Sequence, residues 1–185
     1  MTKTPNKHQL KSISHGLIAT VTVLTWLGAP APVFGQPAGC TLTPDDKNPS
    51  EQILRCGDSL TIRNAPDTRY ELTGQNRQQP LGAVRLESGA LLIEFTASER
   101  QKRFQILTPH AIAAVRGTQW AVEVNPDRTS TLVISGVVEV MRPKQRKGAL
   151  LHDGEGSDVS AGRDPITVKR WGQARIDALM ARFGQ

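Results

Sequence analysis

Hydrophobic and polar positions alternate along much of this chain, and glycine or proline interrupts the alternation at intervals. The stretch Phe104–Val124 shows the pattern most clearly, with a small aliphatic run at Ala111–Val115 and an alternating run at Trp120–Val124. A period of two is typical of half-buried strands, and a glycine between two such runs permits a bend. Because Arg116-Gly117-Thr118 lies between the runs, the pattern predicts a strand, a kink and a second strand.

The same pattern recurs elsewhere and predicts an all-β fold. Glycine turns are expected at Ser88-Gly89, Ser135-Gly136 and Gly154, which form a weak internal repeat, and Asn125–Arg128 suits a type I turn. Short strands separated by glycine turns are typical of a sandwich or of a small solenoid-like stack of β-arches, and both remain open. Further strands are predicted at Gln52–Arg55, Ser59–Arg63, Tyr70–Leu72, Ala83–Leu86 and Ala90–Phe95, and two more within Thr131–Met141, one on each side of Ser135-Gly136.

The period changes near the C-terminus, where Arg170–Phe183 predicts one amphipathic helix. Its apolar stripe either packs on the β domain or is offered to a partner. The stripe consists of Trp171, Ile176, Leu179, Met180 and Phe183.

The first 35 residues have the pattern of a secretory signal peptide. Three lysines precede the apolar stretch Gly16–Ala29, which is shorter than the roughly 20 residues of a membrane-spanning helix. Small or tolerated residues at Val33 and Gly35 favour cleavage after Gly35. We therefore expect export to the periplasm or the medium, with no transmembrane segment left after cleavage.

The net charge and the cysteine content exclude some classes of protein and indicate how the domain is organised. Removing 35 of the 185 residues leaves 150, and loss of the three lysines lowers the net charge from +6 to +3, which is too small to indicate nucleic-acid binding. Cys40 and Cys56 are 16 positions apart in a chain predicted to enter an oxidising compartment, so a disulfide is expected rather than a redox or metal pair. We expect a disulfide-linked β/loop region at 36–80, with Thr43–Ser50 as an exposed loop, a β domain at 81–168 and the helix at 169–185.

Catalytic chemistry has little support in the sequence. Only His110 and His152 follow the signal peptide, and neither lies in a recognisable nucleophile or metal motif. Three hydroxyl residues qualify as nucleophiles by type alone: Thr108, Ser135 and Ser157. The run Asp153–Asp158 resembles a calcium loop but lacks the full ligand pattern. We therefore expect a protein that is not an enzyme and has no cofactor or metal.

One set of residues resembles the core motif of the FecR domain family. The set comprises Thr108-Pro109, Ala111, Val115 and Arg116-Gly117-Thr118, followed by a strand. Thr131–Met141 resembles the family's next element and Gly154-Glu155-Gly156 its last glycine turn, so that the resemblance covers Leu91–Val159. It implies an envelope location and signalling or structural work without catalysis. Parent regulators of the family pass the state of an outer-membrane transporter to an anti-sigma segment. This chain shows a signal peptide in place of that segment, so direct sigma-factor control is not predicted.

The role of Arg116 is the main question that the motif raises. In one hypothesis the motif is structural: Arg116 turns inward onto a carboxylate, Gly117 lies where no side chain fits, and the Thr118 hydroxyl binds the turn. The candidate carboxylates are Glu94, Glu123 and Asp58. In the other hypothesis the motif is a binding site, in which Arg116 is exposed in a groove and is open to an anion or a partner.

The expected function is a protein-interaction or sensing component of an envelope signalling system, bound to an envelope protein. The alternative is a cell-wall or glycan-binding protein. The scarcity of aromatic residues, 4% of the chain, speaks against that alternative.

Overall fold

A computed structural model describes residues 39–45, 52–73, 81–99 and 101–185. The predicted signal peptide at residues 1–35 and its cleavage site lie outside the described residues, as do positions 46–51 and 74–80 of the predicted loops. Within the described ranges, none of the helices is both long and apolar enough to cross a membrane.

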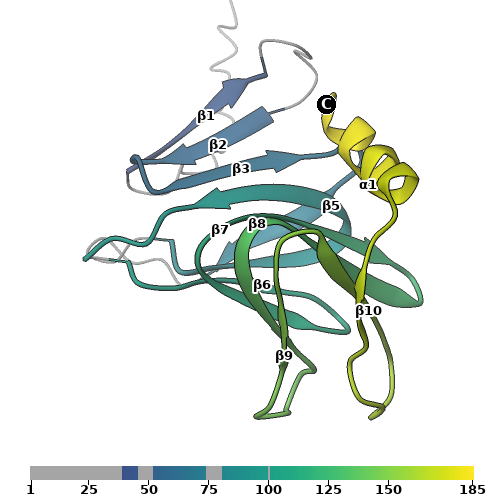
Figure 1. Cartoon of the computed structure of the whole chain (residues 1–185). Coiled ribbons are helices and arrows are strands. Elements are labelled where there is room, and N and C mark those ends of the chain that lie inside the picture. The colour runs from purple at the N-terminus through teal and green to yellow at the C-terminus, as the bar shows by residue number, and fades with distance from the viewer. Residues whose placement is uncertain (1–38, 46–51, 74–80, 100) are drawn as a thin grey trace, which may run out of the picture. The chain divides into compact units, whose positions relative to one another are not determined.

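The described part of the chain folds into one mixed β-sheet followed by a C-terminal helix, which confirms the predicted mostly-β fold (Figure 1). The helix α1 (Gln173–Met180) begins after Gly172 and continues into the 3-10 turn Ala181–Phe183. The strands are β1 (Cys40–Pro44), β2 (Gln52–Cys56), β3 (Leu60–Asn64), β4 (Arg69–Thr73), β5 (Ala83–Phe95), β6 (Phe104–Leu107), β7 (Ile112–Asn125), β8 (Arg128–Met141), β9 (Ala149–Leu151), β10 (Glu155–Ser160) and β11 (Val168–Arg170).

Three of these strands are long and bend at a glycine. Gly89 in β5, Gly117 in β7 and Gly136 in β8 have φ angles of 90°, 121° and 96°. The prediction of turns at Ser88-Gly89 and Ser135-Gly136 is wrong, because β5 and β8 run through both positions without interruption. Glycine at positive φ produces a bulge in a strand as readily as a turn between strands.

The bends allow one sheet to form two layers. The C-terminal half of β5 pairs with β3 and with the C-terminal half of β7, whereas its N-terminal half pairs with β4 and, in parallel, with β6. We call the layer that contains β3 and β10 the first layer, and the one that contains β6 and β9 the second layer. Side chains of both layers meet in one apolar cluster, so the arrangement is that of a sandwich built from a single sheet.

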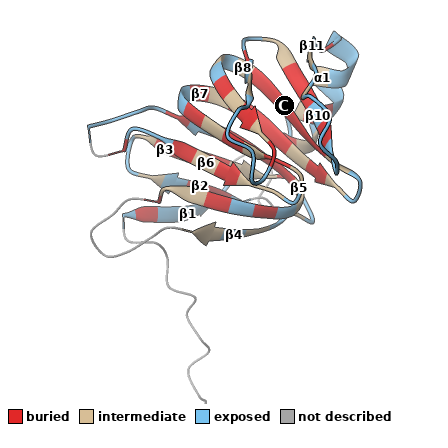
Figure 2. Ribbon diagram, turned by 90° about the horizontal axis from the view of Figure 1, so that it is seen from below, coloured by how far each residue is buried: buried red, intermediate tan, exposed pale blue. Residues whose placement is uncertain are grey.

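The main core lies between the two layers and a smaller one lies outside the first. Trp120, Val122 and Val124 are buried in the main core, as the alternation predicts. Ala121 points to the opposite face but is buried too, because it belongs to the smaller cluster under the C-terminal helix. Figure 2 shows the buried positions along the long strands and the exposed outer side of the helix.

The N-terminal region joins the same sheet through β1 to β3. Cys40 and Cys56 occupy opposite positions on β1 and β2 and form a disulfide with an S–S distance of 2.00 Å. Thr43 and Pro44 belong to β1, so the prediction of a loop is wrong for these two positions. The disulfide fastens the outermost strand of the first layer to its neighbour.

Candidate functional site

The Thr108-Pro109 part of the motif forms the turn between β6 and β7. The Thr108 N–H and hydroxyl both donate to the Ala111 carbonyl oxygen, at 2.9 and 2.8 Å, and the Ala111 N–H donates to the Thr108 hydroxyl at 2.9 Å. Pro109 is exposed and Ala111 is buried against the core. The Thr108 hydroxyl is therefore engaged in holding the turn closed.

The second part of the motif forms the bulge in β7. The pairing with β8 shifts between Val115 and Thr118, and the Thr118 hydroxyl donates to the Val137 carbonyl oxygen at 3.1 Å. A Cβ on Gly117 would meet no atom nearer than 4.0 Å, so the expectation that no side chain fits there is wrong. Glycine is favoured at this position by its φ of 121°. The crowded position is Gly136, where a Cβ would lie 2.6 Å from the Gly117 carbonyl oxygen.

Arg116 is exposed on the outer face of the second layer, and the hypothesis that it turns inward onto a carboxylate is wrong. No ion pair joins Arg116 to any residue that the structure describes. Glu94 instead accepts a hydrogen bond from Gln119, Glu123 pairs with Arg182, and Asp58 lies in an exposed turn. The alternation of β7 puts Arg116 on the same face as Ile112 and Ala114, which points away from the core.

Arg116 borders a shallow hollow of about 200 Å³ on β7, β8 and β9. Val137 and Leu150 lie in its lining and are exposed to 42% and 57%, the largest values among the large apolar side chains of the described residues. We call this set the Arg116 surface, and it consists of Arg103, Ala114, Val115, Arg116, Val137, Glu139 and Leu150.

Val137 and Leu150, the exposed apolar members of the Arg116 surface, were not identified as site residues from the sequence. The available signal was the adjacent pairs Val137-Val138 and Leu150-Leu151. In a strand only one residue of such a pair can face the core, so the other must be exposed or covered by another element. Here Val138 and Leu151 are fully buried, and their neighbours point outward.

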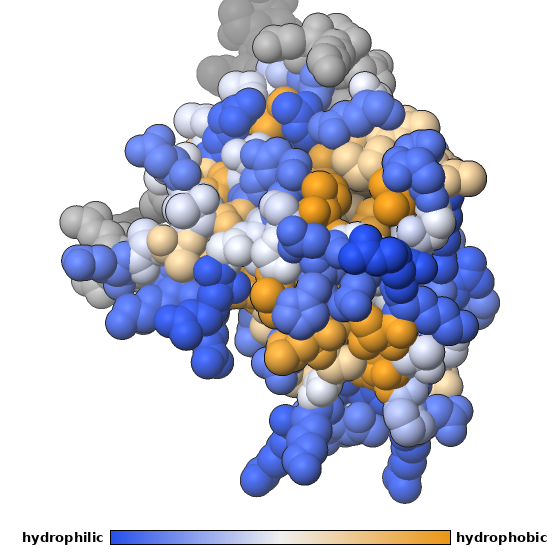
Figure 3. Space-filling view, in the orientation of Figure 1, coloured by the Kyte–Doolittle hydropathy of each residue, from blue (hydrophilic) through white to orange (hydrophobic). Residues whose placement is uncertain are grey.

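The C-terminal helix covers the outer face of the first layer. Trp171, Leu179 and Phe183 are 8%, 5% and 2% exposed, and Ile176 and Met180 are partly buried against the same cluster. Their partners on the sheet are Ala65, Ala90, Leu92, Ala121 and Leu132. Gly156 makes room for the indole ring, because a Cβ there would lie 2.4 Å from it. Figure 3 shows apolar surface beside this helix and, lower in the view, near β9 and β10.

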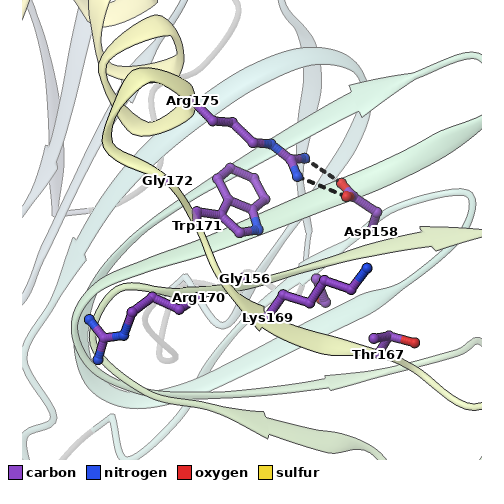
Figure 4. Close-up of a pocket in the computed structure, with 9 residues that line it drawn as sticks. Gly156, Asp158, Thr167, Lys169, Arg170, Trp171, Gly172 and Arg175 are labelled. Atoms are coloured by element: carbon purple, nitrogen blue, oxygen red, sulfur yellow. Dashed lines mark hydrogen bonds and ion pairs between the residues drawn. The ribbon is translucent and has the colours of Figure 1, made fainter.

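Polar groups reinforce the attachment of the helix. The Arg175 guanidinium lies 3.4 Å from the centre of the Trp171 ring and donates to the two Asp158 oxygens at 2.9 and 2.6 Å (Figure 4). Ser130 also donates to Asp158, at 2.6 Å, and Arg182 pairs with Glu123 near the end of the chain. Burial alone would raise the pKa of Asp158, but the hydrogen bonds from Arg175 and Ser130 outweigh it and hold that pKa below its ordinary value.

A cavity of about 350 Å³ lies beside this attachment, and Figure 4 shows the side chains around it. Two of its charged groups, Asp158 and Arg175, are bound to each other, and its aromatic ring lies under Arg175. The geometry therefore serves to hold the helix on the sheet.

The residues considered for chemistry are separated by the fold. Asp153 accepts the Gly136 N–H, Glu155 accepts the His152 N–H, and Asp158 accepts Arg175, so these three carboxylates face different partners. Ser157 is buried in the first layer, whereas Ser135 is exposed on β8. Among the described residues, no group of three or more His, Cys, Asp or Glu side chains could hold a metal ion.

Comparison with solved structures finds a likeness in fold. A crystal structure at 1.65 Å of a proposed anti-sigma factor from Parabacteroides distasonis ATCC 8503 superposes with a TM-score of 0.53 at 15% sequence identity, covering 78% of this chain and 62% of that one. A second crystal structure with the same description, at 2.50 Å, gives a TM-score of 0.47 at 16% identity with the same coverage. This chain thus spans about three fifths of the length of those proteins.

Comparison by sequence identifies the family. No curated protein matches the chain. The family model for the FecR protein matches residues 47–139, about half of the chain. The match begins before the predicted resemblance at Leu91–Val159 and ends before Gly154, and it contains all the motif residues of the turn and the bulge. The chain therefore belongs to the FecR protein family.

Proposed function

We propose that this chain is an exported, non-catalytic FecR module that binds an envelope protein and serves in signalling or sensing. The observation that carries the proposal is the Arg116 surface, where exposed apolar side chains lie beside a family-motif arginine without an ion pair to any described residue. The FecR family is generally non-catalytic. The solved structure that superposes on this chain with a TM-score of 0.53 is described as a proposed anti-sigma factor. A protein partner is consistent with both.

The geometry of the Arg116 surface suits a protein contact. Ala114 on β7 lies opposite Glu139 on β8, and Glu139 lies opposite Leu150 on β9, so that their side chains form one row across three strands. Val137 shares the outward face of β8 with Glu139. Exposed apolar side chains beside arginine are typical of protein interfaces, in which arginine is enriched. Glu139, in the middle of the row, adds a negative charge to this surface.

Export belongs to the same proposal. The support is the signal-peptide pattern of residues 1–35 and the Cys40–Cys56 disulfide, a bond that persists in oxidising compartments. We expect the mature chain to begin at Gln36 and to be found in the periplasm or the medium. Mass spectrometry of the protein from an envelope fraction tests this, and an intact Met1 start would refute it.

Photo-crosslinking tests the binding surface. We would place a photoreactive amino acid at Leu150 and, as a matched control, at Leu42, which is also an exposed leucine on a strand but lies outside the surface. We expect one discrete adduct from Leu150 in envelope extract, no adduct from Leu42, and loss of the Leu150 adduct when Arg116→Glu is added. Equal crosslinking from both positions, or an adduct that survives Arg116→Glu, would contradict the proposal.

The alternative of glycan or wall binding is not favoured by the aromatic residues. Glycan sites typically present open aromatic rings, but Trp120 is fully buried and Trp171 is buried beneath Arg175. Tyr70 is partly buried against the core, and Phe95, Phe104 and Phe183 are buried. A wall-sedimentation assay run beside the crosslinking checks this, since we expect the protein to stay in the supernatant.

A further inference from the structure

Three loops that are far apart in the sequence meet around a second hollow, a cleft of about 420 Å³. They are the turn after β6, which contributes His110, the loop after β8, which contributes Arg142–Gln145, and the loop after β10, which contributes Ser160–Arg163. The cleft shares no lining residue with the Arg116 surface. Its position at the ends of strands is independent of the family motif's bulge.

Arg142 is the unusual residue of this cleft, because it is charged and only 7% exposed. Its Nε donates to the Asp164 carbonyl oxygen at 3.0 Å and its Nη1 donates to the Ser160 carbonyl oxygen. Both acceptors are neutral, and the described residues provide no ion pair for this guanidinium. Carbonyl oxygens fix the orientation of the fork but do not neutralise its charge, and an uncompensated buried charge is costly.

The rim adds more positive charge. Lys144 and Arg163 are exposed and line the same cleft, and none of the lining residues that the structure describes is acidic. Asp164 is the acidic residue next to this lining: its backbone carbonyl accepts from Arg142, and its carboxylate lies 3.9 Å from where a Cβ on Gly162 would be. Three cations line the concave site, so positive charge is in excess there.

The backbone at Lys144 is held in an unfavourable conformation. Lys144 has a φ of 68° in a turn closed by the Gln145 N–H and the Arg142 carbonyl oxygen, at 3.1 Å, with Pro143 before it. Glycine or asparagine adopts positive φ in this type of turn at lower cost. A lysine here loses backbone stability and places a cation at the mouth of the cleft, a combination that points to a functional site.

We propose that this cleft binds a phosphate group. Arg142 supplies the guanidinium N–H groups that its bonds to the Asp164 and Ser160 carbonyl oxygens leave free, held in a fixed orientation by those bonds. Lys144 and Arg163 supply charge from the rim. Three cations match a compact group with about two negative charges better than a single carboxylate. A volume of about 420 Å³ exceeds that of the phosphate alone, so the group is carried on a larger molecule, either a soluble phosphate ester or a phospholipid headgroup.

Calorimetry on the purified protein tests the site, with inorganic phosphate and glycerol phosphate as the soluble probes. Lys144→Gly and Arg163→Gln remove one rim cation each, and Lys147→Gln is the matched control, because Lys147 is an exposed lysine of the same loop that does not line the cleft. Arg142 is left intact, since its loss would disturb the loops that it joins. We expect each rim variant to weaken binding about tenfold, the loss of one charge-assisted contact, and Lys147→Gln to leave it unchanged.

Lys144→Gly has a second readout that a purely structural lysine would not produce. Glycine relieves the positive φ, so we expect the melting temperature of this variant to rise while its affinity for phosphate falls. Cosedimentation with phosphatidylglycerol vesicles, with phosphatidylcholine vesicles as the reference, distinguishes the two sources of the group. Binding to phosphatidylglycerol vesicles that depends on Lys144 assigns the site to lipid, and binding of the soluble probes alone assigns it to an ester. Absence of binding to every probe, or equal weakening by Lys147→Gln and Lys144→Gly, would overturn the proposal.

Discussion

The two outer faces of the folded sheet carry apolar side chains, but only one of them is covered by the described chain. On the first layer, Leu92, Ala121 and Leu132 are at most 1% exposed beneath the C-terminal helix. On the second layer, Val137 and Leu150 remain 42% and 57% exposed beside Arg116. Burial of apolar area stabilises a fold by about 25 cal/mol per Å². The first face therefore contributes to folding, whereas the second is available to contribute to binding.

This difference decides the roles of the C-terminal helix and of the FecR motif, each of which had two possible roles on the sequence alone. The helix stripe was either packed on the domain or offered to a partner, and its buried residues are packed. The FecR motif was either structural or partner-binding, and it divides: Thr108, Ala111 and Thr118 hold the turn and the bulge, while Arg116 is exposed. The partner-binding element is thus better sought on β7 to β9 than on the helix.

Truncation of the helix anchor should give the largest effect. Phe183 is 2% exposed in the cluster under the helix, so Phe183→Ala is expected to lower the free energy of unfolding by about 3–5 kcal/mol. Leu150→Ala on the open face is the control and should cost less than about 0.5 kcal/mol. Urea unfolding of both variants measures the difference. A Phe183→Ala protein as stable as the parent would mean that the helix does not cover the sheet in solution.

Substitution of the glycines at the bend between the layers should have the second-largest effect on stability. Gly117 and Gly136 both have positive φ, and an alanine at either position is strained by about 1–3 kcal/mol. Only at Gly136 would the new Cβ also meet backbone, 2.6 Å from the Gly117 carbonyl oxygen, which adds about 1–3 kcal/mol of overpacking. We expect Gly136→Ala to be the more destabilising of the two in thermal unfolding. The opposite ranking would show that the bend is built differently.

Sequence reasoning found the elements with a clear period and the turn at Asn125–Arg128, but it mistook two bends within strands for turns. The alternation of Trp120–Val124 and the stripe of the C-terminal helix correctly indicated which side chains are buried. Gly89 and Gly136 were predicted to lie in turns, because a glycine before an apolar run is the same sequence pattern in a hairpin turn and in a bulge within one strand. The pairing partners that decide this are distant in the sequence.

The candidate site was harder to predict for the same reason. Alternation places Arg116 on the same face of β7 as Ile112 and Ala114, but which face of β7 points away from the core depends on its pairing with distant strands. The exposure of Leu150 depends on β9 lying at the sheet edge, where its outer face has no helix above it in the described structure. The burial of Arg142 depends on the loop after β10, which supplies the Ser160 carbonyl oxygen. Each of these three features depends on residues that are distant in the sequence and that only the fold brings together.

A smaller effect is expected from the ion pair that links the helix to β10. The pKa of Asp158 is lower in the folded chain than its ordinary value of 3.8, so the pair stabilises the fold above about pH 4 and loses this effect as the pH falls through the lowered value. Both side chains are more than 40% exposed, so the contribution near pH 7 is about 0.2–1 kcal/mol.

Asp158→Asn should therefore differ from the parent near pH 7 and converge with it toward pH 2, as measured by melting temperature. Asp127→Asn, which removes an aspartate that is 70% exposed and paired with Arg128 away from the helix, is the matched control for the loss of one carboxylate. A difference between Asp158→Asn and the parent that persists at pH 2 would assign the effect to something other than charge.

The smallest effect on stability, and the most informative for function, is expected from Arg116→Ala. If Arg116 were buried on a carboxylate, its removal would cost about 3–5 kcal/mol, because a buried charge would lose its partner. Since the side chain is exposed and forms no ion pair with the described residues, we expect a change within about 0.5 kcal/mol in urea unfolding. The same variant should lose the adduct formed from Leu150, because the arginine borders the hollow in which that leucine lies. Arg103→Ala tests the other cation of the surface. Normal stability together with a lost adduct would show that the open face contributes to binding and the covered face to folding. A strongly destabilised Arg116→Ala protein would show instead that Arg116 contributes to the stability of the fold.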